Sequence, residues 1–115
     1  LVTIKYSQTI TGISSFNNAE YGFKLFQNYP NPFNPSTKIS YEIPFKSKVN
    51  LKVFDILGNE ISELVNSLQN AGSYSVSFDS HKSGLNLSSG IYLYQLVIES
   101  ETGVFSQVNK MILLK

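Results

Sequence analysis

The chain has 115 residues, a net charge of +1, 15% charged residues and no cysteine. This length fits one domain, which is large enough to fold without disulfides. The lack of cysteine excludes disulfides and thiolate metal sites, and the low net charge argues against nucleic acid or an anionic membrane as a partner. The aromatic residues are tyrosine and phenylalanine, which favour strands. We therefore expect one β-rich domain.

The first residues differ in composition from the rest of the chain. Residues 2–7 alternate apolar and polar side chains, as a short strand does. The residues that follow, up to Gly22, are mostly small and polar, as in a linker. We interpret residues 1–22 as the end of a preceding domain plus a flexible linker, and residues 23–115 as the main domain. The alternative is that residues 2–6 add an edge strand to it. Because the sequence begins at Leu1, we expect it to be the C-terminal part of a longer protein.

A proline-rich segment, residues 29–37, introduces the first clear strand and holds three of the four prolines. Each proline fixes φ and removes an amide donor, so the segment is neither a helix nor a central strand. Asn31 and Asn34 favour turns, whereas Tyr29 and Phe33 are large apolar side chains that need a surface to cover. We predict a stiff loop that packs onto the domain through Phe33 and Tyr29. The alternative is a P-x-x-P ligand for an aromatic groove.

Alternating side chains predict strands at residues 38–43, 49–54 and 73–79. The segment 60–65 is ambiguous, because Ile61, Leu64, Val65 and Leu68 have helical spacing. We predict a strand, since a tight turn at Gly58 precedes the segment and Asn66-Ser67 ends it.

The last third of the chain predicts a hairpin. Residues 90–98 are apolar on both faces, which indicates a strand that is buried on both sides or one whose outer face is covered by a loop such as 29–35. Residues 101–103 form a turn, and residues 104–114 return antiparallel. In all, about seven short strands joined by turns predict an all-β, antiparallel β-sandwich.

No group of residues predicts an active site. His81 is the only histidine and lies in a serine-rich loop, and no serine lies in a Gly-x-Ser-x-Gly turn. Glu60 with Glu63 and Glu99 with Glu101 could each be neighbours, but we place them on exposed turns or edges and not in a cleft. We therefore predict that the domain is not an enzyme and has no small-molecule substrate.

The sequence also contains little evidence for a metal-binding site. Asp79, Ser80, Asn86 and Ser88 offer oxygen atoms in one loop, but they lack the regular carboxylate spacing of a calcium loop. We interpret them as turn-forming residues and expect neither a metal nor a cofactor.

Four blocks, in order, resemble a known family: residues 25–37 with Ile39, 53–58, 87–94 and 110–115. Over roughly residues 23–115 the chain is similar to the C-terminal sorting domain of the type IX secretion system, also called the Por secretion system tail. The motif positions in this chain are Tyr29, Pro30, Asn31, Pro32, Phe33, Asn34, Pro35, Gly58, Gly90 and Tyr92. The chain departs from the family pattern at Asn59, where a basic residue is common, and at its end, where a single basic residue, Lys110, precedes the apolar run.

The resemblance implies an Ig-like sandwich attached to an exported protein of Bacteroidetes or their relatives. Such a domain folds in the periplasm, is recognised by the outer-membrane translocon and leads its cargo to the cell surface or the extracellular space. In many members a sortase-like peptidase then removes the domain, which places the cut between residues 14 and 22 here. The strand-like residues 2–6 also resemble part of a β-propeller-type repeat, which implies a repeat protein as cargo. We expect the domain itself to be a monomer.

The resemblance also implies that the end of the chain belongs to the recognition element. This segment consists of Lys110, Met111, Ile112, Leu113, Leu114 and Lys115. A final strand at a sheet edge presents unpaired backbone groups, so we expect Met111 to Leu114 to bind a receptor by strand addition.

Two other functions fit the same strands. The first is a purely structural Ig-like module, similar to the C-terminal domain of flagellar hook-capping proteins, which shares two of the motif blocks. The second is a carbohydrate-binding or adhesive sandwich that uses Tyr74, Tyr92 or Tyr94 as exposed stacking platforms.

Overall fold

The structure is a computed structural model, which describes residues 22–82, 85–101 and 103–115. The predicted strand at residues 2–6 and most of the predicted linker lie outside the described residues. The seven strands are β1 (Lys24–Leu25), β2 (Ser36–Ile43), β3 (Ser47–Asp55), β4 (Glu60–Gln69), β5 (Gly72–Asp79), β6 (Gly90–Ser100) and β7 (Gly103–Leu113). Within the described part of the chain, no helix has the length and apolar character needed to cross a bilayer.

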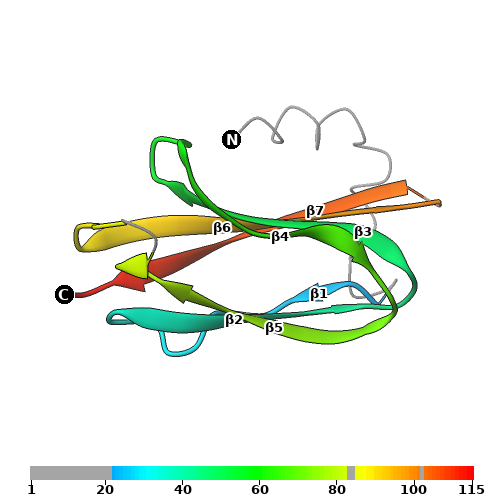
Figure 1. Ribbon diagram of the computed structural model, residues 1–115, viewed down its shortest axis with the longest axis horizontal. Helices are drawn as coiled ribbons and strands as arrows, with labels where there is room; N and C mark the ends of the chain where they lie inside the picture. The colour runs from blue at the N-terminus through cyan, green and yellow to red at the C-terminus, as the bar shows by residue number, and fades with distance from the viewer. Residues whose placement is uncertain (1–21, 83–84, 102) are drawn as a thin grey trace.

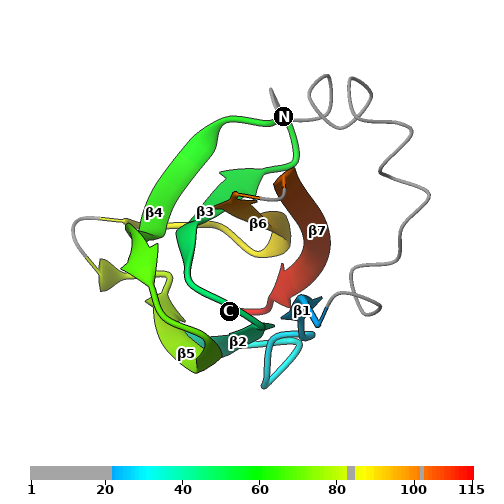
Figure 2. The ribbon, with the colours of Figure 1, turned by 90° about the vertical axis from the view of Figure 1, so that its right-hand side faces the viewer.

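The strands form two antiparallel sheets that face each other (Figures 1 and 2). One sheet has the order β1-β2-β5 and the other has the order β4-β3-β6-β7. Pairing of β2 with β5 in one sheet, and of β3 with β6 and β6 with β7 in the other, is the arrangement of Ig-like sandwiches. The predicted all-β, Ig-like antiparallel β-sandwich of about seven strands is therefore confirmed.

The alternating positions of the sequence fill the space between the sheets. Every second side chain of a strand points to the same face, so one set per strand is buried. The buried sets are Ile39, Tyr41 and Ile43 in β2, Val49, Leu51 and Val53 in β3, and Tyr92, Tyr94, Leu96 and Ile98 in β6. In β2 and β3 these are the positions at which apolar residues alternate with polar ones, whereas β6 is apolar on both faces.

The ambiguous segment at residues 60–65 is a strand, as predicted, but it continues to Gln69. The predicted end at Asn66-Ser67 is wrong because β3 pairs with β4 along its whole length, from Ser47 opposite Gln69 to Phe54 opposite Glu60. Backbone pairing with a central strand outweighs the low strand propensity of the polar residues.

The sandwich has two ends with different contents, which we call the entry end and the far end. At the entry end Gly22 leads into β1, and the ring of Phe23 stacks on Phe105 with ring centroids 4.4 Å apart and meets the edge of Phe45 at 5.4 Å. At the far end lie the β3–β4 turn, the start of β6 and the end of β7 (Figure 1). The described chain therefore enters at one end of the sandwich and finishes at the other.

Candidate functional site: the proline loop and the last strand

Residues 26–35, which we call the proline loop, connect β1 to β2 and lie along the outer edge of β7. A bridge between Tyr29 and Lys38 joins the loop to β2, and a parallel bridge between Phe33 and Leu113 joins it to β7. The loop thus ties both sheets together at one side of the sandwich. It does not cover the outer face of β6, as one of our explanations for that strand required, because β7 lies between the loop and β6.

Phe33 fixes the loop, as predicted. Its side chain is 1% exposed, and its ring approaches the ring of Phe78 with centroids 6.1 Å apart at 70°. Its backbone N–H donates to the Ile112 carbonyl at 2.8 Å, and its own carbonyl accepts from the N–H of Leu114 at 3.0 Å. Phe33 therefore acts as a one-residue strand beside β7, with its ring in the core.

The prediction that Tyr29 packs onto the domain is wrong, since its side chain is 81% exposed. Both the N–H and the carbonyl of Tyr29 bond to the backbone of Lys38 at 3.0 Å. Side chains of directly paired residues point to the same face of a sheet. Lys38 points to solvent, so Tyr29 does too.

A buried polar network, which no local sequence pattern predicts, holds the base of the loop. The Asn28 N–H donates to the Tyr94 hydroxyl at 2.9 Å, and the Asn28 side-chain amide donates to Thr37 Oγ1 at 3.0 Å and to the Pro30 carbonyl at 3.1 Å. The Tyr94 hydroxyl donates to the Phe26 carbonyl at 2.8 Å. Burial raises the pKa of Tyr94, although the amide groups of Asn109 and Asn28 that donate to its hydroxyl oppose this effect.

The outward backbone groups near the end of β7 are already bonded to the loop. Besides its two bonds with Phe33, β7 donates from the Ile112 N–H to Asn31 Oδ1 at 3.0 Å, and the Lys110 carbonyl accepts from Gln27 Nε2 at 2.7 Å. The last strand lies at the sheet edge, as expected, but the expectation that Met111 to Leu114 offer unpaired backbone is wrong at Ile112 and Leu114. The reason is that the proline loop supplies the missing neighbour.

The side chains at the end of β7 divide by alternation. Met111 and Leu113 are completely buried, whereas Lys110, Ile112, Leu114 and Lys115 are exposed. Any partner that meets this segment in the folded domain therefore meets two lysines and two aliphatic side chains.

The remaining motif residues shape the far end. Gly58 has φ = +91° in the β3–β4 turn, a conformation that side-chain-bearing residues avoid. Gly90 begins β6 opposite Leu113. Tyr92 is buried, and its hydroxyl donates to the Ser88 carbonyl at 2.7 Å. These motif positions build the scaffold on which the end of β7 rests.

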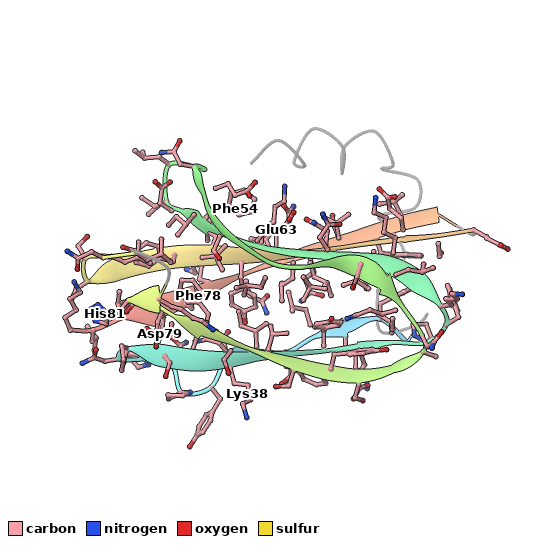
Figure 3. The ribbon with its side chains drawn as sticks, in the orientation of Figure 1. Lys38, Phe54, Glu63, Phe78, Asp79 and His81 are labelled. Atoms are coloured by element: carbon pink, nitrogen blue, oxygen red, sulfur yellow. The ribbon has the colours of Figure 1, made fainter. Side chains whose placement is uncertain are left out.

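His81 and the pair Glu60 and Glu63, which we considered for catalysis, lie in different parts of the domain. Figure 3 places His81 and Asp79 at the far end of the sandwich and Glu63 over the four-stranded sheet. The backbone N–H of His81 donates to Asp79 Oδ1 at 2.8 Å. Glu60 and Glu63 do lie near each other, but both face Lys52, whose Nζ is 3.0 Å from Glu60 Oε1 and 3.9 Å from Glu63 Oε2.

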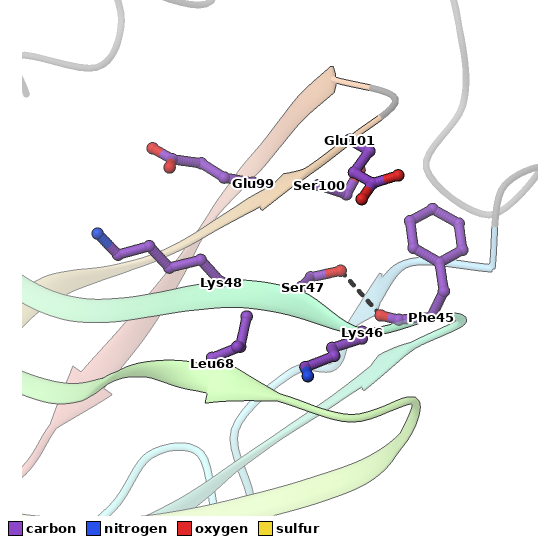
Figure 4. A pocket seen from close by; sticks show the side chains of 8 residues that line it. All are labelled: Phe45, Lys46, Ser47, Lys48, Leu68, Glu99, Ser100 and Glu101. Carbon is purple, nitrogen blue, oxygen red and sulfur yellow. Dashed lines mark hydrogen bonds between the residues drawn. The ribbon is translucent and has the colours of Figure 1, made fainter.

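A cavity of about 770 Å³ lies at the entry end, between the start of β3 and the end of β6 (Figure 4). Its lining residues are Phe45, Lys46, Ser47, Lys48, Leu68, Glu99, Ser100 and Glu101. The prediction that Glu99 and Glu101 lie outside a cleft is therefore wrong, although their carboxylates point to opposite sides in Figure 4. The Ser47 hydroxyl donates to the Phe45 carbonyl at 2.8 Å, so its proton is directed to the backbone and not to a catalytic base.

The loop oxygens considered for calcium also serve other purposes. Asp79 accepts from the backbone of His81, and Asn86 Oδ1 accepts from Lys115 Nζ at 3.3 Å. Across the described ranges, no three His, Cys, Asp or Glu side chains are placed to share a metal ion.

Two of the three proposed stacking platforms for a glycan, Tyr92 and Tyr94, are buried. The third, Tyr74, is half-buried and stacks on Tyr41 with ring centroids 5.4 Å apart. The carbohydrate-binding alternative therefore loses the exposed aromatic faces on which it depended.

The fold and the loop together define a class of protein: an Ig-like sandwich whose last strand is covered by its own proline loop. Residues 27–113 match the family model described as secretion system C-terminal sorting domain. The chain belongs to this family, which confirms the resemblance seen in the sequence. It is a sorting domain of the type IX kind, a secretion signal for export to the cell surface or the extracellular space. A search of curated proteins finds no match.

Two solved structures share the fold. The first is dimeric latent PorU from Porphyromonas gingivalis, with a TM-score of 0.62 and 22% identity over 76% of this chain and 9% of that chain. The second is PorZ of the same organism, described as an essential surface component of the type-IX secretion system, with a TM-score of 0.52 and 15% identity over 85% of this chain and 12% of that chain. The chain thus spans a small part of each protein, and at these identities the likeness shows the fold alone.

Proposed function

We propose that this domain is a secretion signal, which the outer-membrane translocon of the type IX system recognises after the protein has crossed the periplasm. It acts as a monomer and catalyses no reaction. The observation that carries the proposal is the pairing of the proline loop with the end of β7, which fixes residues 110–115 in one conformation on the surface.

The recognition element consists of side chains and not of free backbone. Ile112 and Leu114 have their outward backbone groups bonded to the loop, so strand addition at these positions is blocked. The exposed side chains of Lys110, Ile112, Leu114 and Lys115 are what a receptor meets. Residues 110–115 thus remain the proposed recognition element, but the receptor contacts their exposed side chains and does not pair with their backbone.

A sortase-like peptidase removes the domain by cutting between residues 14 and 22. The support is the burial of Phe23, whose ring stacks on Phe105, because a protease needs several residues in an extended and accessible form. A cut before Gly22 leaves the domain of residues 23–115 whole.

Export of a reporter fused in front of the full 115-residue chain tests the proposal. Deleting residues 110–115 abolishes export to the medium, but the deletion also removes the buried Met111 and Leu113. The sharper variant is therefore Ile112→Ser with Leu114→Ser, and its control is Val108→Ser, since Val108 and Ile112 are each 37% exposed in the same strand. Export of the double variant at the level of the Val108 control would refute recognition through this segment.

Mass spectrometry of the exported fusion tests the removal. A mature product that ends between residues 14 and 22 supports cleavage, whereas an intact product supports a permanent structural module of the hook-capping kind. Light scattering of the purified chain tests the monomer, and a dimer would contradict that part of the proposal.

A further inference from the structure

The turn between β3 and β4 is held rigidly by Asp55. The Asp55 N–H donates to the Asn59 carbonyl and the Gly58 N–H donates to the Asp55 carbonyl, both at 3.0 Å. The Asp55 carboxylate accepts from the N–H groups of Leu57 and Asn59 at 2.9 Å and from the Asn59 side-chain amide at 3.0 Å. These hydrogen bonds, led by that from the Asn59 side chain, lower the pKa of Asp55, so the carboxylate is ionised near neutral pH.

This rigid turn presents two aliphatic side chains to water. Leu57 is 84% exposed and Ile56 is 66% exposed. The turn needs the carboxylate of Asp55 and the backbone conformation of Gly58, and neither requirement explains aliphatic residues at the tip. Single exposed aliphatic residues are ordinary on protein surfaces. These two indicate an interaction site only if they belong to a larger apolar surface.

The surroundings of the turn are apolar as well. A recess of about 460 Å³ separates the turn from residues 86–92 and is lined in part by Ile61, Leu87 and Ile91. Ile91 is the Cα partner of Ile112 in the β6–β7 pair, so the apolar surface continues to the end of β7. The exposed aliphatic residues of the far end thus form one region, the far-end patch: Ile56, Leu57, Ile91, Ile112 and Leu114.

The position and charge of the far-end patch indicate the kind of partner it fits. It lies at the end of the sandwich opposite the one where Gly22 leads into β1 (Figure 1). Lys110 and Lys115 flank it, and neither belongs to an ion pair among the residues that the structure describes. The carboxylates nearby are engaged, Asp55 by its turn and Glu60 by Lys52. Lys115 Nζ donates to the neutral Asn86 Oδ1 at 3.3 Å, a bond that does not compensate its charge. Among the described residues, therefore, no carboxylate balances the positive charge beside the patch, and its aliphatic side chains stay exposed.

We propose that the far-end patch docks a protein of the secretion machinery, through an apolar segment of that protein bordered by carboxylates. The apolar segment enters the recess between the β3–β4 turn and residues 86–92, and Leu57 packs over it. This inference rests on the proposed function and adds to it a contact at Leu57, which lies 53 positions before Lys110, the first residue of the terminal segment. The secretion signal is then a surface composed of the β3–β4 turn and the terminal segment, and not the terminal segment alone.

Secretion of the reporter fusion tests the patch. In Ile56→Asn with Leu57→Asn, residues that suit a turn replace the two aliphatic tips, and we expect exported reporter to decrease by about tenfold, which corresponds to ~1.4 kcal/mol of binding. The matched control is Leu68→Asn, since Leu68 is 62% exposed but lies at the entry end. Export of the double variant at the control level overturns the inference. If the Ile112→Ser/Leu114→Ser variant is also exported normally, the proposed function fails with it.

A photo-crosslinking side chain at position 57 in the full chain keeps the test independent of folding defects. We expect crosslinks to a component of the translocon from position 57 and none from position 68. Crosslinks between two copies of the chain would show that the patch is a self-association surface, and crosslinks to neither would leave it without a protein partner; both results overturn the inference.

Discussion

The two edges of the four-stranded sheet are protected in different ways. β7 is covered by the proline loop, which contributes backbone hydrogen bonds at Phe33 and a buried ring. β4, at the opposite edge, is not covered by another strand of the described chain. It carries charged and polar side chains, and its pairing with β3 is irregular at two places, between Leu51 and Lys52 and between Val53 and Phe54. Charged side chains and irregular pairing are known devices against edge-to-edge association.

This difference shows which of the two edges depends on contacts with distant parts of the chain. The protection of β4 is local, because Glu60 and Glu63 belong to β4 itself and both face Lys52 of the neighbouring β3. The protection of β7 depends on residues about 80 positions earlier in the chain, such as Gln27 and Asn31. Changes in the proline loop should therefore affect global stability, and changes along β4 should not.

Truncation of Phe33 should give the largest effect. Phe33→Ala removes a fully buried ring beside Phe78 and leaves a cavity, so we expect a loss of about 3–5 kcal/mol in the free energy of unfolding. Tyr29→Ala, in the same loop but with an exposed ring, should change it by no more than ~0.5 kcal/mol. Urea denaturation followed by circular dichroism measures both, and equal losses in the two variants would contradict the asymmetry.

Removal of the Tyr94 hydroxyl should come next. Tyr94→Phe leaves the buried N–H of Asn28 without its acceptor and the Phe26 carbonyl with only the 3.5 Å bond from the Asn109 side-chain amide, so we expect a loss of about 1–3 kcal/mol. Tyr92→Phe is the control, because the Tyr92 hydroxyl makes a single bond, to the Ser88 carbonyl, and its removal should cost about 1 kcal/mol or less. A Tyr94→Phe variant as stable as wild type would show that the network does not hold the loop.

Local sequence patterns predicted the strands and the packed loop. Pairing between distant segments determined the orientation of Tyr29 and the length of β4, which the local patterns did not predict. Alternation located the strands and their buried faces, and the proline segment located a packed loop with Phe33 inside. The orientation of Tyr29 escaped prediction because it follows from its bridge to Lys38. The length of β4 was not predicted because it is determined by pairing with β3.

The candidate site was predictable only in part for the same reason. Residues 110–115 stand out in sequence, but their backbone partners lie in the proline loop, and Asn28 and Tyr94 are 66 residues apart. Pattern reasoning over a window of ten residues carries no information about such pairs. The exposed Leu57 and Ile56 gave one signal in the sequence, an aliphatic pair in a turn next to Gly58, which we read only as part of a turn.

Alkaline pH should weaken the covered edge. Burial raises the pKa of Tyr94 and of Tyr41 above the ordinary value of 10.0. The unfolded chain then releases these protons first, so stability is constant up to about pH 10 and decreases above it until the folded tyrosines also ionise. Urea denaturation at increasing pH should show this decrease in wild type and a smaller one in the double variant Tyr41→Phe/Tyr94→Phe. An equal slope in both would assign the alkaline loss to other groups.

Neutralising a charge on the β4 edge should give the smallest effect. The Asn50 side-chain amide, with smaller contributions from Asn66 and Lys52, lowers the pKa of Glu63 below its usual 4.5. A lowered pKa means that the stabilisation is present above the unfolded value and disappears as the pH decreases through the folded value. Glu63→Gln should therefore lower the melting temperature slightly at neutral pH and low salt, and the difference from wild type should vanish in acid, once the folded-state carboxyl is protonated, and at about 1 M salt. Because Glu63 is exposed, screening keeps this effect small. If Glu63→Gln destabilised the domain as much as Phe33→Ala, the protection of β4 would not be local, and the contrast between the two edges would fail.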